Sequence, residues 1–162
     1  MADSSFDVVS DFDQQELVNA LDQVRREVGT RFDFKGARIS LELGKGEIIL
    51  LADDEFRAAS VKDLVQTKAV RRGLSLKVFD WGKLEPAAGG TVRQRIGLHR
   101  GLTSEQAKQI SKMIRDRFPK VKPVIQGDAV RVSGKSKDDL QGVITHLREL
   151  DYPVALQFSN YR

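Results

Sequence analysis

The sequence lacks cysteine, has only two histidines and contains no long apolar run. Without cysteine, disulfides, thiolate metal sites and a cysteine nucleophile are excluded. The longest apolar run covers residues 48–52 and is far too short to span a membrane. The first residues, MADSSFD, are acidic and polar and do not resemble a signal peptide. We therefore expect a cytoplasmic protein that does not associate with membranes.

Charge is distributed unevenly along the 162 residues. Residues 1–90 carry 13 Lys/Arg and 16 Asp/Glu, a net charge of −3, whereas residues 91–162 carry 14 and 7, a net charge of +7. A basic half indicates an anionic partner, such as a nucleotide, a nucleic acid or an acidic protein surface. The alternative is that the two halves of the chain attract each other.

Hydrophobic periodicity predicts the same order of elements twice. The first set comprises a strand, a helix, a hairpin, a helix and a strand, at 6–10, 17–28, 39–51, 54–72 and 74–79. The second set has the same order, with the last helix over 140–150, and occupies 91–159. Each set reads βαββαβ, which predicts an α+β protein of two tandem ferredoxin-like domains. Each domain would have an antiparallel four-stranded sheet with two helices on one face.

The segment WGKLEPAAGG, at 81–90, interrupts every periodicity and contains Pro86. We therefore predict a linker at 81–90 between a first domain at 1–80 and a second, basic domain at 91–162. Pairing of the terminal strands across the two domains remains an alternative arrangement.

A tight hairpin is predicted around Gly127-Asp128, because this pair tolerates the positive φ angles of a two-residue turn. The turn would pair Val124 with Arg131 and Ile125 with Val130, so that the arginine lies on the face away from the core. Directly after the hairpin, Ser136 is placed to cap a helix.

Six cations of the second half are predicted to form an anion-binding region. In ferredoxin-like order the first and third strands are neighbours, which would bring Arg93 and Arg95 beside Arg131 on the open face of the sheet. The other three members are Lys135, Lys137 and Arg162. Domains that read RNA bases place stacking aromatics at these central positions, and this sequence has none. The face is therefore expected to attract phosphate or contact another domain, and the alternative is a solvated charged face.

The motif RFDFKG, at 31–36, supplies a second candidate region. In an extended segment Phe32 and Phe34 would share one side and pack in the core. Arg31 and Lys35 would then lie on the other side, available to an anion.

The sequence offers no catalytic set. His99 and His146 have no evident partner, and a lone histidine is more often structural or exposed. The acid pairs at 53–54 and 138–139 stand where helices begin, and the helix dipole explains them without metal chemistry. We predict a protein that is not an enzyme and needs no metal or cofactor.

Several separated motifs resemble the YajQ family of small bacterial nucleotide-binding proteins. These motifs are SFDVVSD, RFDFKG, VIQGDAVRVSGKSKDDLQ and LQFSNYR, at 5–11, 31–36, 124–141 and 156–162. The resemblance implies two ferredoxin-like domains, nucleotide binding and no established enzymatic activity. Cyclic di-GMP is the ligand attributed to some members of the family, and these members resemble effectors that act on transcription. The family usually has Lys-Lys-Arg-Asp-Asp where this chain has KSKDD, so Lys137 keeps the charge of an arginine without its bidentate geometry.

Together these patterns predict a non-enzymatic nucleotide-binding protein. More specifically, they predict an effector that binds cyclic di-GMP and influences transcription. Its partners would be a nucleotide and a transcription regulator or RNA. The alternative is an RNA- or protein-interaction module with a basic sheet face, and an unrecognised nucleotide-processing enzyme is a third class.

Overall fold

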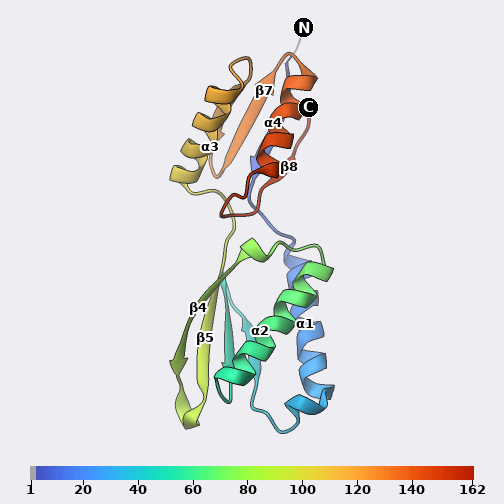
Figure 1. Cartoon of the computed structure of the whole chain (residues 1–162), viewed down its shortest axis with the longest axis vertical. Helices are drawn as coiled ribbons and strands as arrows, with labels where there is room; N and C mark the ends of the chain where they lie inside the picture. The colour runs from blue at the N-terminus through green and yellow to red at the C-terminus, as the bar shows by residue number, and fades with distance from the viewer. Residues whose placement is uncertain (1–2) are drawn as a thin grey trace. The chain divides into compact units, whose positions relative to one another are not determined.

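The computed structural model describes residues 3–162, which form two compact units (Figure 1). The central unit is Phe12–His99, and the terminal unit combines residues 3–11 with Arg100–Arg162. Each unit buries its own hydrophobic core. The chain therefore passes from one unit to the other twice, after Asp11 and after His99.

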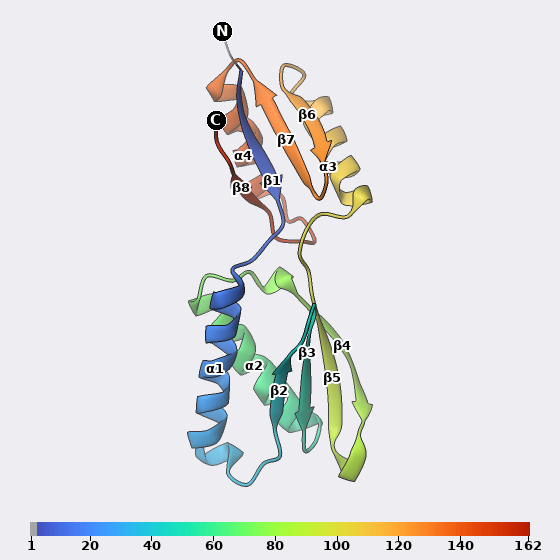
Figure 2. The same cartoon turned by 180° about the vertical axis from the view of Figure 1, so that it is seen from behind.

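The terminal unit has an antiparallel sheet of order β6-β7-β1-β8. Figure 2 shows β1 between β7 and β8, and helices α3 and α4 cover one face of the sheet. Its elements are β1 (Ser4–Val9), α3 (Ser104–Arg117), β6 (Lys122–Gln126), β7 (Ala129–Gly134), α4 (Lys137–Glu149) and β8 (Gln157–Ser159). The cap at Ser136 is present, as predicted, and Thr103 and Gln106 form a capping box at the start of α3.

The central unit has a second antiparallel sheet, of order β2-β3-β5-β4, with α1 and α2 on one face. Its helices and strands are α1 (Gln14–Thr30), β2 (Ser40–Leu43), β3 (Glu47–Ala52), α2 (Glu55–Arg71), β4 (Phe79–Pro86) and β5 (Val92–Leu98). Short 3-10 turns complete it: η1 (Phe32–Phe34), η2 (Leu76–Val78) and η3 (Ala88–Gly90). The turn η2 occupies three of the six residues of the strand that was predicted at 74–79, and β4 begins only at Phe79.

Both units have the ferredoxin-like α+β architecture, so the predicted fold class is confirmed. Their first strands, however, are exchanged. The N-terminal strand β1 completes the sheet of the terminal unit, and β5 completes the sheet of the central unit. Each of the two units therefore combines elements of both predicted domains, 1–80 and 91–162. The pairing of β1 with β7 and β8 is the cross-domain pairing of a terminal strand that was stated as the alternative.

The segment at 81–90 explains the exchange. It is not a linker: it forms most of β4 and the turn that follows, because Trp81 and Pro86 pair with residues of β5. The turn closes through a hydrogen bond from the Ala87 N–H to the Thr91 carbonyl at 2.8 Å, and Gly89 and Gly90 adopt the positive φ angles it requires. A hairpin this tight makes β5 the neighbour of β4, so β5 belongs to the central unit.

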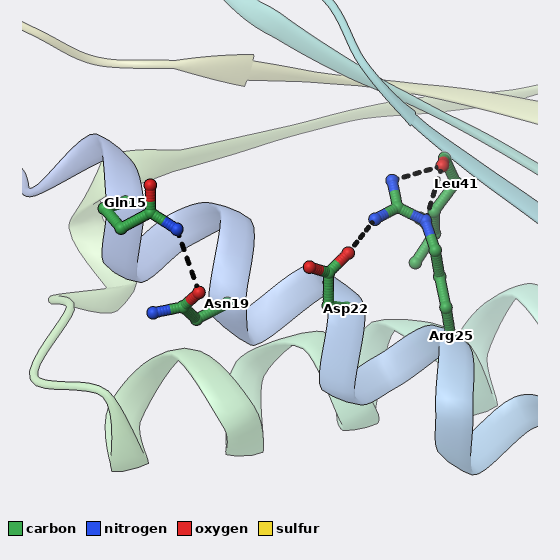
Figure 3. A network of polar contacts seen from close by, with 5 residues as sticks. All are labelled: Gln15, Asn19, Asp22, Arg25 and Leu41. Atoms are coloured by element: carbon green, nitrogen blue, oxygen red, sulfur yellow. Dashed lines mark hydrogen bonds and ion pairs between the residues drawn. The ribbon is translucent and has the colours of Figure 1, made fainter.

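The short edge strand β2 is fixed by an arginine of α1 (Figure 3). Arg25 donates through Nε and Nη2 to the carbonyl of Leu41, at 3.1 and 2.6 Å, and its Nη1 contacts Asp22 Oδ1 at 2.9 Å. The carbonyl of an edge strand is thus satisfied by a side chain, which leaves it less available to another strand.

Replacement of Gly127 by Val should destabilise the terminal unit. Gly127 has φ +60° in the β6–β7 turn, and a β-branched residue in this region of φ/ψ space costs about 1–3 kcal/mol. Urea unfolding followed by circular dichroism would measure the loss. Gly29→Val is the matched control, since Gly29 lies in α1 with open space around it. An unchanged midpoint for Gly127→Val would contradict the turn assignment.

Candidate functional site

The three arginines predicted to share one sheet face lie in different sheets. Arg93 and Arg95 are on β5 of the central unit, where the neighbouring strands are β3 and β4. Arg131 is on β7 of the terminal unit, between β6 and β1. The prediction was wrong because it assumed that β5 and β7 are adjacent in one sheet.

Two of these arginines are already engaged by carboxylates. Arg95 Nη1 lies 2.9 Å from Glu47 Oε1, and Arg131 Nε donates to Asp7 Oδ1 at 3.0 Å. The Nε of Arg93 is buried and has no hydrogen-bond partner among residues 3–162. Both ion pairs place a negative charge beside the arginine, which reduces the attraction of either arginine for an anionic ligand.

The strand exchange also removes the predicted charge asymmetry. The terminal unit carries 12 Lys/Arg and 10 Asp/Glu, and the central unit carries 15 and 13. Each unit therefore has a net charge of +2, and neither is the basic domain predicted for 91–162. Local clusters of cations, and not the charge of a whole unit, must attract an anion.

The RFDFKG segment is a 3-10 turn and not an extended strand. Phe34 is buried at 3% exposure, whereas Phe32 is 87% exposed. The prediction that both phenylalanines pack in the core is thus correct only for Phe34, because residues two apart point in different directions in a 3-10 turn. Arg31 lies over the Phe34 ring and pairs with Asp33 at 2.7 Å, while Lys35 is exposed.

The other three predicted cations lie in the terminal unit around the start of α4. Lys137 and Arg162 line one pocket of about 350 Å³, which we call the tail pocket. Lys135 lines an adjacent depression described below. The tail pocket is formed by Ser4, Ser5, Phe6, Lys137, Leu140, Gln141, Ile144, Tyr161 and Arg162. It therefore joins residues from both ends of the chain.

Helix α4 forms one wall of the tail pocket. Lys137, Gln141 and Ile144 follow each other at the spacing of one helix face, with Leu140 beside them. Leu140 and Ile144 are buried and make this wall apolar, whereas Lys137 and Gln141 are exposed. One wall thus offers an apolar surface, a positive charge and an amide.

The opposite wall consists of β1 and the last residues of the chain. The backbone N–H and carbonyl of Ser5 exchange hydrogen bonds with Arg162, at 3.1 and 3.0 Å. Between β8 and this pair, the Tyr161 ring lies with its centroid 6.2 Å from that of Phe6. Tyr161 is 63% exposed, so much of its aromatic surface is open to a ligand.

A second depression, of about 520 Å³, lies on the other side of the start of α4. We call it the lysine groove, because Lys120, Lys122 and Lys135 line it, together with Asp3, Ser133, Gly134, Ser136 and Asp139. None of the three lysines has an ion-pair partner among residues 3–162. Ser136 in the groove and Lys137 in the tail pocket are consecutive, so the two regions adjoin.

Of the cations in this region, the sequence analysis named Lys135, Lys137 and Arg162 and did not name Lys120 and Lys122. It also missed the aromatic and the amide of the tail pocket. Tyr161 and Gln141 fall within motifs that carry the family resemblance, but no periodicity links them. Their proximity depends on the contact of β1 with the C-terminal residues, which lie more than 150 positions away in the sequence. The one local feature of the sequence that could have indicated this pocket is Tyr161 next to Arg162, an aromatic beside a cation.

The histidines do not form a reactive centre in the described part of the chain. His146 packs its ring against Phe118, with centroids 6.0 Å apart, and His99 is exposed at the end of β5. No group of three His, Asp or Glu side chains within residues 3–162 is arranged to hold a metal ion. No helix over the same residues has the length and apolar character to cross a membrane.

Comparisons with known proteins give consistent matches along the chain. The model of a family described as "Nucleotide-binding protein YajQ-like" matches residues 4–162. A protein from Chloroflexus aggregans named "Nucleotide-binding protein" is 61% identical over 162 residues, covering 99% of this chain and 98% of its own. Similarly named proteins of Synechococcus elongatus and Trichodesmium erythraeum are 59% and 54% identical over 159 residues, with 98% of each chain covered.

Acid should weaken the terminal unit through Asp7. Hydrogen bonds from Arg131 and Asn160 lower the pKa of Asp7 below its ordinary value of 3.8, against an opposing effect of burial. The stabilisation is complete above that value and is lost as the pH falls through the lower pKa of the folded state. The stability advantage of the wild type over Asp7→Asn should therefore shrink progressively as the pH falls below about 5 in urea titrations. Asp116→Asn, at an exposed site on α3, controls for removal of a carboxylate. If the stability difference between the wild type and Asp7→Asn stays constant over this pH range, Asp7 is not the source of the acid sensitivity.

Proposed function

Because the chain belongs to the family of YajQ-like nucleotide-binding proteins, we propose that it binds a nucleotide in the tail pocket. The observation that carries the proposal is that an exposed tyrosine, two apolar residues of α4, a lysine and an arginine line the same pocket. Aromatic stacking suits any base, and the cations suit a phosphate. The pocket volume of about 350 Å³ lies near the lower end of the range for ligand sites, which suits about one nucleotide.

The geometry supports separate roles for the residues of the pocket. Tyr161 would stack on the base, with Leu140 and Ile144 covering its other side. Gln141 carries both a donor and an acceptor, as recognition of a base edge requires. Lys137 and Arg162 would contact the phosphate by charge-assisted hydrogen bonds. None of the other five predicted cations lines the tail pocket: Arg93, Arg95, Arg131, Arg31 and Lys35.

Within this class of ligand, we propose a cyclic dinucleotide, with cyclic di-GMP as the specific candidate. The resemblance to the family implies this ligand, and the lysine groove supports it. A first nucleotide would occupy the tail pocket and the second phosphate would reach Lys135, which lies two residues from Lys137. The protein would then act in the cytoplasm as an effector, contacting a transcription regulator in its ligand-bound state.

A second candidate function is favoured by the lysine groove alone. A groove that follows the backbone of single-stranded RNA needs positive charge along it. The lysine groove is lined by Lys120, Lys122 and Lys135. Binding of this kind weakens steeply with salt and shows little preference among bases. A shallow salt dependence together with base preference would exclude the RNA module as the main function.

Tyr161→Ala should weaken nucleotide binding by about tenfold or more, because stacking of one base on an aromatic contributes about 1–3 kcal/mol. Lys137→Ala should have an effect of similar size through the loss of a phosphate contact. Calorimetry with GTP, ATP and cyclic di-GMP measures both. Phe32→Ala, at an exposed aromatic residue, and Lys112→Ala, at an exposed lysine, are controls outside the pocket that should bind normally. Wild-type affinity in both pocket variants would overturn this assignment of the site.

We further propose that the protein leaves its ligand chemically intact. Incubation with GTP, ATP or cyclic di-GMP and magnesium should give no product by chromatography, since the tail pocket contains no nucleophile paired with a general base. Steady product formation that is abolished by Lys137→Ala or Gln141→Ala would identify the protein as an enzyme.

A further inference from the structure

The pairing of β1 with the C-terminal residues contains one extra residue. Along β8, Asp7 is opposite Ser159, and the register continues regularly to Val9 opposite Gln157. In the same register Ser5 would lie opposite Tyr161. Ser5 instead exchanges both backbone hydrogen bonds with Arg162. The C-terminal strand therefore bulges by one residue directly before the tail pocket.

The bulge lies at Asn160, which has φ +58° and is the only residue other than glycine with positive φ within 3–162. The alternation of side chains is inverted after this point. Without the bulge, Asn160 would follow Phe158 on the helix-covered face and Tyr161 would point to the open face. In the structure the Asn160 side chain contacts Asp7 on the open face, and the Tyr161 ring lies beside Phe6 on the helix-covered face.

The conformation of Asn160 is held by a chain of polar contacts across three strands. Asn160 Nδ2 donates to Asp7 Oδ2 at 2.9 Å, and Arg131 donates to both carboxylate oxygens of Asp7, at 3.0 and 3.4 Å. Asparagine tolerates positive φ better than other residues with a Cβ, and its amide satisfies the carboxylate. The same arginine that was predicted to bind an anion thus serves to orient the C-terminal residues.

We infer that Asn160, Asp7 and Arg131 are positioning residues for nucleotide binding, which act through Tyr161 from the opposite face of the sheet. This inference rests on the proposed binding of a nucleotide in the tail pocket. It assigns a role in affinity to three residues that do not touch the ligand. Their part is to keep the bulge, and with it the aromatic wall of the pocket.

The decisive comparison is Asn160→Val against Asn160→Gly. Valine strongly disfavours positive φ, whereas glycine adopts it readily and removes only the contact to Asp7. Asn160→Val should weaken binding of GTP and cyclic di-GMP as much as Tyr161→Ala does, about tenfold or more. Asn160→Gly should lose about threefold or less. In a Tyr161→Ala background, Asn160→Val should have little further effect, since it acts through the missing ring.

Two more variants test the support of the bulge. Asp7→Ala and Arg131→Ala should reduce affinity in the same direction as Asn160→Val. Arg95→Ala is the matched control, because it also breaks an arginine-carboxylate pair on a sheet face but lies in the central unit. Equal losses from Arg95→Ala and Arg131→Ala would overturn the inference.

A measurement without ligand separates this inference from the proposed function. In NMR spectra, the Tyr161 ring should show nuclear Overhauser contacts to Phe6 in the wild type and in Asn160→Gly, and these contacts should disappear in Asn160→Val. If they persist in Asn160→Val, the bulge does not orient Tyr161 and the inference fails. If they disappear while affinity for both probes is unchanged, the link to binding fails. A wild type that binds neither probe overturns the proposed function for these ligands and leaves the NMR contacts as the test of the positioning.

Discussion

Each sheet depends on a central strand that the other half of the chain supplies. A central strand forms hydrogen bonds along both edges, so β1 joins β7 to β8 and β5 joins β3 to β4. Both strands also contribute to the buried layer beneath the helices, through Phe6 and Val8 in one unit and Ile96 in the other. Neither core can close without its exchanged strand, and the tail pocket depends on this closure because β1 forms one of its walls.

The elements themselves were predictable because each depends on nearby residues. Helix caps at Thr103 and Ser136, the Gly127 turn and the pairing of Val124 with Arg131 are all local, and the structure contains them. The exchange of strands was not predictable in this way. The alternation of apolar residues shows that β1 and β5 are half-buried, but both sheets offer the same kind of central position. In the sequence, the glycines at 89–90 were the available indication of a hairpin turn. Glycines are equally typical of a linker, so they could not decide between the two.

The candidate site was predictable in part, for the same physical reason. Cations are visible in a sequence, and Lys137 and Arg162 do line the pocket. Whether a cation is free depends on its partner, and Asp7 lies 124 positions from Arg131. The orientation of Tyr161 depends on one backbone torsion at Asn160, which no pattern of hydrophobicity records. Long-range contacts thus decide which of the predicted residues can meet a ligand.

The exchanged strands have a consequence for the synthesis of the protein. The central unit is complete once β5 has emerged from the ribosome, and it can fold while the rest of the chain is still being made. The terminal unit has to wait, because β1 is made first and its partner β8 last, and this large sequence separation also slows folding. During this interval β1 has two exposed edges and an apolar face, so it is the segment most open to chaperones and to unwanted strand pairing. Ser5 and Arg162 together form one wall of the tail pocket, so this wall can form only after the intervening β7 and α4 have been made.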